Sequence, residues 1–280
     1  MKQRIITAII ILLVIIPVLA LSEYIVYPIA LSVFSLIAVF EMLRAIGSHK
    51  KLSVSLPAYI IAGALPLFAH DIFLGEDAAR AKNYILICAG VLFAYLLYIM
   101  CIAVFSKGNI TVSEIGEIFF TVTYISISFA ALSLVRYMEY GNVTFLLVFI
   151  AAWVSDVGAY FVGSFIGKHK LIPEVSPKKT IEGSIGGIVV ATLAFILYGL
   201  IVERLTDLTA DYVVLSVSGV LLAVVSQIGD LIASLIKRER GIKDYSNLLP
   251  GHGGIMDRFD SIMAVATPFL GICLIAPPFM

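Results

Sequence analysis

Acidic, basic and glycine residues are concentrated in residues 237–260, between two strongly apolar segments. Lysine and arginine can neutralise phosphate oxygens, Arg as a planar fork and Lys as a point charge. Closely spaced glycines let backbone N–H groups approach an anion without side chains in the way. Asp257 and Asp260 are three residues apart, share one face of a predicted helix, and suit Mg²⁺, which binds one or two carboxylates plus substrate phosphates. The stretch predicts metal-assisted phosphate chemistry, with further candidates at Lys237, Arg238, Lys243, Gly251, His252, Gly253 and Gly254.

Two more carboxylates lie inside apolar segments, Asp156 in Trp-Val-Ser-Asp-Val-Gly and Asp230 in Gln-Ile-Gly-Asp-Leu. A carboxylate at membrane depth is costly unless it faces a polar cavity, a partner or a metal, so each predicts a functional site. An interhelical hydrogen bond from a protonated or Lys-paired Asp is the alternative for both.

A second polar stretch occupies residues 166–183 and contains Ser-Pro-Lys-Lys-Thr-Ile-Glu-Gly. Just before it, residues 163–169 imitate a phosphate-binding P-loop but have three residues between their glycines, where that motif needs four, and His169 replaces Ser or Thr. A P-loop is therefore excluded. Gly183 and Gly187, four apart at the start of an apolar segment, predict close packing between helices.

These polar stretches are positioned by a very apolar chain, which is 61% hydrophobic and 14% charged, with a mean hydropathy of +1.06. Such a composition requires lipid as solvent, and continuous apolar runs without alternation favour helices over a barrel. We expect an all-α polytopic bundle of about nine transmembrane helices, as one continuous domain with a helical scaffold over 1–140 and a catalytic region over 141–280. The predicted helices cover 4–22, 25–43, 53–69, 83–105, 117–135, 143–165, 184–202, 212–236 and 261–277.

The distribution of basic residues predicts the orientation. If the first helix starts inside, fifteen of the nineteen Lys and Arg residues face the cytoplasm, including Lys107 and those of 166–183 and 237–260. The outer segments keep Arg80, Lys82, Arg136 and Arg204. The first apolar run also has features of a signal peptide, although a retained helix is favoured. The three cysteines stand singly and are interpreted as core residues.

A patch for anionic lipid headgroups is the alternative interpretation of residues 237–260. It explains the Lys and Arg residues but not Asp244, Asp257 and Asp260, which would weaken such a patch. The net charge of zero gives no indication of nucleic acid binding.

The order and spacing of the residues in 234–260 form a specific motif. Residues 234–238 read S-x-x-K-R, residues 243–244 read K-D, and residues 250–260 read P-x-H-G-G-x-x-D-R-x-D. This stretch resembles the signature of the phosphatidate cytidylyltransferase (CDP-diacylglycerol synthase) family, and 176–183 and 156–160 resemble two further blocks of that family. The likeness covers about residues 150–262. Ile181 stands where the family often has Trp, and Ser164 where it often has Arg.

The resemblance implies attack by a lipid phosphate oxygen of phosphatidic acid on the α-phosphorus of CTP, with release of pyrophosphate. It implies Mg²⁺, with a second cation left open, and the catalytic residues Asp230, Asp257, Lys237 and Arg238. Asp230 and Asp257 are the first candidates as metal ligands, followed by Asp260 and Asp156. The implied substrate-binding residues are Ser176, Lys178, Lys179, Thr180, Glu182, Ser234, Lys243, Asp244, His252, Gly253, Gly254 and Arg258.

The expected location is a membrane, most simply a bacterial inner membrane, with the active site on the cytoplasmic side and a homodimer as an open alternative. A CTP-dependent enzyme acting on another lipid, such as a polyprenol kinase or an archaeal-type CDP-lipid synthase, would use a similar cationic face. An ion-coupled transporter using Asp156 and Asp230 is a further alternative, but no inverted repeat is visible.

Overall fold

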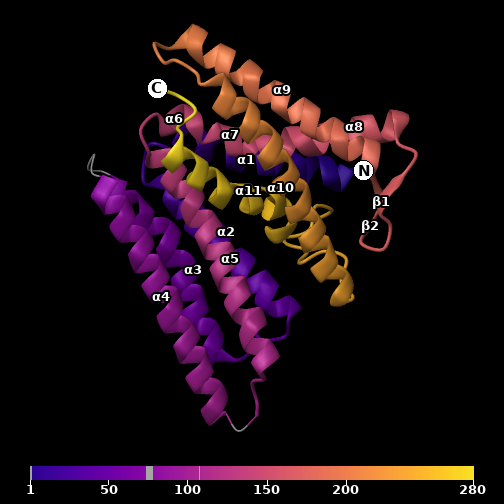
Figure 1. The fold of residues 1–280 in the computed structure, drawn as a ribbon. Helices are drawn as coiled ribbons and strands as arrows, with labels where there is room; N and C mark the ends of the chain where they lie inside the picture. Colours follow the sequence, from indigo (N-terminus) through magenta and orange to yellow (C-terminus); the bar gives the residue numbers. More distant parts are fainter. Residues whose placement is uncertain (1, 74–77, 107) are drawn as a thin grey trace. The chain divides into compact units, whose positions relative to one another are not determined.

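The structure is a computed structural model that describes residues 2–73, 78–106 and 108–280, without the side chains of 2–5, 70–73 and 78–82. The predictions for Lys107 and for the side chains of Arg80 and Lys82 lie outside the described residues. Within these residues, eight helices are long and apolar enough to cross a membrane, and Ile6–Ala20 forms a shorter apolar helix. The expected all-α polytopic membrane protein is confirmed (Figure 1).

Backbone contacts divide the chain into two compact units. The first unit contains Met1–Tyr137 together with Ile242–Arg258, and the second contains Met138–Gly241 together with Phe259–Met280. The segment Ile242–Arg258 therefore belongs to the first unit, although the residues before and after it belong to the second. The predicted partition into 1–140 and 141–280 stays a prediction.

The first unit is built from α1 (Lys2–Ala20), α2 (Val26–Ala45), α3 (Leu52–Phe73), α4 (Ala78–Phe105) and α5 (Val112–Tyr137). Helices α2, α3 and α5 pack against one another, and α4 lies beside α3 and α5 (Figure 1). Fully buried side chains such as Tyr27 and Phe129 fill this core. At one end, Lys51 forms an ion pair of 2.7 Å with Glu114.

The sixth apolar segment is not one regular helix as predicted. It consists of α6 (Gly141–Thr144), α7 (Leu146–Phe149), the π-helical turn η1 (Ile150–Val154) and α8 (Ser155–Ile166). A π turn adds residues to the helical repeat and is frequent at functional sites. Here it directly precedes Asp156 in the first turn of α8.

The polar stretch 166–183 folds into a hairpin that was not predicted. Strand β1 (Lys170–Ile172) pairs antiparallel with β2 (Ser176–Thr180), with Lys170 opposite Thr180 and Ile172 opposite Ser176. The residue before a proline favours extended backbone, which suits Ser176 before Pro177. The hairpin projects from the end of α8 (Figure 1).

Three long helices complete the second unit: α9 (Ile181–Leu205), α10 (Tyr212–Glu239) and α11 (Met256–Ile275), the last of which begins in the first unit. Helix α9 packs against α8 and α10. A Cβ atom at Gly183 would lie 2.7 Å from the carbonyl oxygen of Ala159, and one at Gly187 would lie 3.0 Å from the Cβ of Ala159. The prediction that these glycines permit close helix packing is confirmed.

Candidate functional site

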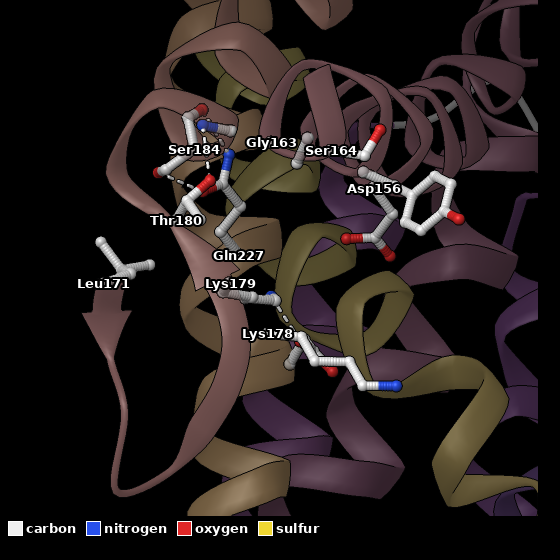
Figure 2. Close-up of a pocket in the computed structure, with 13 residues that line it drawn as sticks. Asp156, Gly163, Ser164, Leu171, Lys178, Lys179, Thr180, Ser184 and Gln227 are labelled. Atoms are coloured by element: carbon white, nitrogen blue, oxygen red, sulfur yellow. Dashed lines mark hydrogen bonds and ion pairs between the residues drawn. The ribbon is translucent and has the colours of Figure 1, made fainter. Parts of the chain in front are cut away.

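A cavity of about 330 Å³ in the second unit gathers several predicted site residues (Figure 2). The walls come from α8, the β1–β2 hairpin, the start of α9 and the middle of α10. The volume lies within the range of small-molecule sites. The lining residues are Asp156, Ala159, Tyr160, Gly163, Ser164, Leu171, Lys178, Lys179, Thr180, Gly183, Ser184, Gln227 and Asp230.

The cavity carries both signs of charge. Lys179 on β2 forms an ion pair with Asp230 on α10, and each side chain is about one quarter exposed. The buried Lys179 Nζ makes no hydrogen bond of good geometry within the described residues. An ammonium group has three N–H donors, so those not directed at Asp230 can serve an anionic ligand. Lys178, the preceding residue on β2, and Asp156 line the same cavity, as Figure 2 shows.

A third carboxylate, outside the cavity lining, interacts with these charges. Asp260, near the start of α11, is 9% exposed and interacts electrostatically with Asp230 and, more weakly, with Lys237 and Asp156. Carboxylates that repel one another are stabilised by a cation. Within the described residues no three His, Cys, Asp or Glu side chains form a preformed metal cluster. The arrangement nevertheless fits Mg²⁺, because this ion uses few protein carboxylates and takes its other ligands from water and phosphate.

One wall of the cavity is an amide and hydroxyl network that sequence analysis missed. Gln227 accepts a hydrogen bond from the Ser184 hydroxyl, while its Nε2 donates to the Ser184 carbonyl oxygen at 3.1 Å and to the Ser155 hydroxyl at 3.4 Å. The network ties α8, α9 and α10 together beside Asp230. A polar amide within an otherwise apolar helix is the signal that could have indicated it.

Two predicted substrate-binding residues make structural hydrogen bonds. The hydroxyl of Thr180 accepts from the Gly183 N–H at 3.1 Å and caps α9. Glu182 accepts hydrogen bonds from the backbone N–H groups of Lys168 and His169 and contacts His169 Nδ1 at 2.6 Å. These contacts join the first turn of α9 to the segment that precedes β1. Ser176 begins β2 and is not among the residues that line the cavity.

The last two turns of α10 carry further predicted residues. Ser234 follows Asp230 by one helical turn, and Lys237 and Arg238 lie in the final turn. Cations there face the negative end of the helix dipole, which stabilises them. Arg238 is exposed, as are Lys243, Asp244 and Arg258 in the following segment.

The first unit contains the rest of the signature stretch, where Asp257 organises a tight loop. Its Oδ2 accepts hydrogen bonds from the backbone N–H of Tyr245 at 2.8 Å and of Gly254 at 2.9 Å. Gly253 has a φ of +83°, which favours glycine, and a Cβ atom there would lie 2.6 Å from that oxygen. The carboxylate is 9% exposed, so the loop both buries and orients it.

His252 lies at the tip of this loop. The His252 N–H donates to the Leu249 carbonyl oxygen at 2.8 Å, and the Leu249 N–H donates to the Gly253 carbonyl oxygen at 2.9 Å, which closes the turn. The buried Nδ1 of His252 has no hydrogen-bond partner in the part of the chain that the structure describes. This nitrogen therefore has hydrogen-bonding capacity left for a ligand, and the substrate-binding role of His252 stays a prediction.

Comparison with known proteins identifies the family of the chain. The profile of the cytidylyltransferase family matches residues 2–275. The chain belongs to this family. The match makes the protein a nucleotidyltransferase, and it extends the likeness from 150–262 to nearly the whole chain.

Curated relatives are similar over almost their full length. A Bacillus subtilis protein named phosphatidate cytidylyltransferase is 35% identical over 278 residues, covering 96% of each chain. A Staphylococcus epidermidis protein of the same name is 37% identical over 275 residues, covering 98% of this chain and 99% of the relative. One from Staphylococcus aureus is 34% identical, again covering 98% and 99%.

Proposed function

We propose that this protein is a phosphatidate cytidylyltransferase, which converts CTP and phosphatidic acid into CDP-diacylglycerol and pyrophosphate. The structural observation that carries the proposal is the cavity in which Asp156, Lys178, Lys179 and Asp230 meet. It combines the cations that phosphates need with the carboxylates that a divalent ion needs. The name shared by relatives at 34–37% identity supports the choice of lipid and nucleotide.

The reaction joins two polyanions. An oxygen of the phosphatidate phosphate forms a bond to the α-phosphorus of CTP, and the bond from that phosphorus to the bridging oxygen breaks, so that pyrophosphate leaves with the electron pair. No protein nucleophile is needed. Catalysis is then mostly positioning and charge neutralisation, which Lys178 and Lys179 supply as cations from one strand.

The carboxylates of the second unit would hold the divalent ion, with Asp230 as the first ligand and Asp156 and Asp260 as ligands or supporting charges. Mg²⁺, when bound, would neutralise phosphoryl oxygens of the nucleotide. Lys179 already pairs with Asp230, so the lysine and the ion would share the negative charge of one carboxylate. We also propose Asp257 as a metal ligand and leave a second cation open. The support for both is the resemblance of the signature stretch alone.

The membrane setting suits a lipid substrate. Apolar helices keep the protein in the bilayer, where phosphatidic acid resides. The excess of basic residues in 166–183 and 237–260 supports a cytoplasmic site, open to soluble CTP. The bacterial origin of the relatives supports a bacterial inner membrane as the proposed location.

The test is to incubate purified protein with phosphatidic acid, Mg²⁺ and each nucleoside triphosphate in turn, and to analyse the lipids and the released phosphates. We expect CDP-diacylglycerol and pyrophosphate with CTP only, and no product after chelation with EDTA. Formation of CDP and a phosphorylated polyprenol from added polyprenol would instead identify a kinase. Absence of any nucleotide-linked lipid with correctly folded, membrane-inserted protein would overturn the proposal.

A further inference from the structure

A carboxylate of the N-terminal scaffold lies buried against the signature stretch. Glu41, near the end of α2, is 1% exposed. Its Oε2 accepts a hydrogen bond from the Met256 N–H at 2.8 Å. Its Oε1 accepts from the Ile255 N–H at 3.2 Å and from the Ser246 hydroxyl at 2.5 Å. All of these residues belong to the first unit.

These hydrogen bonds compensate a costly burial. A carboxylate removed from water needs donors for its oxygens, or it destabilises the fold. Met256 is the first residue of α11, so its N–H lacks an acceptor within the helix, and a negative charge there also interacts favourably with the helix dipole. The burial of Glu41 is therefore tolerated only when residues 246–256 adopt this conformation.

Gly254 fits the same carboxylate sterically. A Cβ atom at this position would lie 2.5 Å from the Cδ of Glu41. Unlike Gly253, Gly254 does not have a positive φ, so backbone conformation alone does not require glycine there. Glycine is thus required at the two adjacent positions for different reasons. A side chain at position 253 would collide with Asp257, and one at position 254 would collide with Glu41.

A second contact from α2 reaches the same loop. Arg44, almost one turn after Glu41, donates from Nη2 to the carbonyl oxygen of Tyr245 at 2.5 Å. The N–H of Tyr245 in turn donates to Asp257 Oδ2, which also accepts from Gly254. Helix α2 therefore holds the residues on both sides of the Asp257 carboxylate.

We propose that Glu41 is a positioning residue for nucleotidyl transfer, which fixes the loop 244–256 and through it the orientation of Asp257. This inference rests on the proposed function for its effect on activity. It gives a role to the N-terminal helices, whose apolar sequences identify none. Glu41 itself does not touch substrate in this scheme and acts through the loop.

The first experiment is Glu41→Gln, which keeps the size of the side chain but replaces one acceptor oxygen by an amide donor and removes the charge. In detergent or nanodiscs, hydrogen–deuterium exchange should show faster exchange in peptides covering 244–258 and unchanged exchange in those covering 181–205. Turnover should fall about 10–100-fold, the range seen when supporting partners of a site are removed. The Mg²⁺ concentration for half-maximal activity should rise, while KM for CTP changes little.

Glu114→Gln is the matched control. Glu114 is also a paired carboxylate of the first unit, and its hydrogen bonds and ion pair within the described residues go to Lys51, Ser48 and Thr111 rather than to the loop. This variant should lower thermal stability without changing exchange in 244–258 or the Mg²⁺ dependence. Equal effects of Glu114→Gln and Glu41→Gln on these two readouts would reduce Glu41 to a general stabilising residue and overturn the proposal.

The second experiment uses the contact between Glu41 and Gly254. Gly254→Ala should be strongly defective because its Cβ collides with the Glu41 carboxylate, whereas Glu41→Asp withdraws that carboxylate by one methylene. The combined variant should therefore be more active than Gly254→Ala alone, a non-additivity expected only for residues in contact. An equal Gly254→Ala defect in both backgrounds would overturn the coupling. Since exchange needs no turnover, loop protection tests Glu41 even if CTP and phosphatidic acid prove not to be the substrates.

Discussion

Lys179 and Asp230 form an ion pair between strand β2 and helix α10 in the wall of the second unit's cavity. From the sequence, these residues were assigned to different ligands, the lysine to phosphate and the aspartate to metal. Their contact means that the two predicted subsites are adjacent. A phosphate held by Lys179 would lie beside an ion held by Asp230, which is the arrangement that metal-assisted phosphoryl chemistry needs.

Replacing Asp230 by Asn should reduce turnover by about 10²-fold or more, because the side chain keeps its size but loses the charge that a hard divalent ion requires. Stability should change little, since a partly exposed ion pair contributes about 0–1 kcal/mol. Asp207→Asn, an exposed acid of the same unit, serves as the control. Near-parental Mg²⁺-dependent turnover of Asp230→Asn would refute the metal assignment.

Lys179→Ala should mainly raise KM for CTP and lower kcat/KM about 10–100-fold, as expected for the loss of a charge-assisted hydrogen bond. High CTP should restore part of the rate, because Lys178 remains at the cavity. Lys170→Ala removes a lysine from the other strand of the hairpin, outside the cavity lining, and should leave the kinetics unchanged. An unaltered CTP dependence in Lys179→Ala would contradict its role.

Asp257→Asn should also lower activity by orders of magnitude, if the carboxylate charge serves a metal ion. The remaining carbonyl oxygen of Asn can accept the N–H groups of Tyr245 and Gly254, so the loop should stay ordered. Asp257→Ala would instead leave two buried donors unpaired, at about 1–3 kcal/mol each. If the Asp257→Asn variant is fully active and the Asp257→Ala variant does not fold, the role of Asp257 is purely structural.

Topology can be tested with single cysteines introduced into a variant that lacks Cys88, Cys101 and Cys273. A cysteine from Lys243→Cys should react with a membrane-impermeant maleimide only after permeabilisation, because the basic segment 237–260 is expected inside. One from Asp207→Cys, in the connection between α9 and α10, should react in intact cells. Strong labelling at 243 in intact cells would reverse the orientation and remove the proposed access of CTP.

Composition and hydropathy were enough to predict the transmembrane helices, because lipid forces every backbone polar group to be satisfied within a continuous apolar helix. The signature stretch was enough to indicate the family, because residues 234–260 carry the residues fixed in the family's signature at the same spacing. Gly183 and Gly187 likewise indicated close packing before any contact was known. The hairpin at 170–180 was missed because its short, polar strands have no apolar alternation to mark them.

The contacts within the candidate site and around Glu41 join distant parts of the chain, so no local sequence pattern predicts them. The pairing of Lys179 with Asp230 joins residues 51 positions apart, and Glu41 reaches Met256 across 215 positions. A buried carboxylate is stable only where several donors converge on it, and no run of neighbouring residues records which distant backbone will supply them. The sequence by itself therefore determined the membrane fold and the kinds of groups in the site. Only the folded chain decided which carboxylate faces a lysine and which one holds a loop in place.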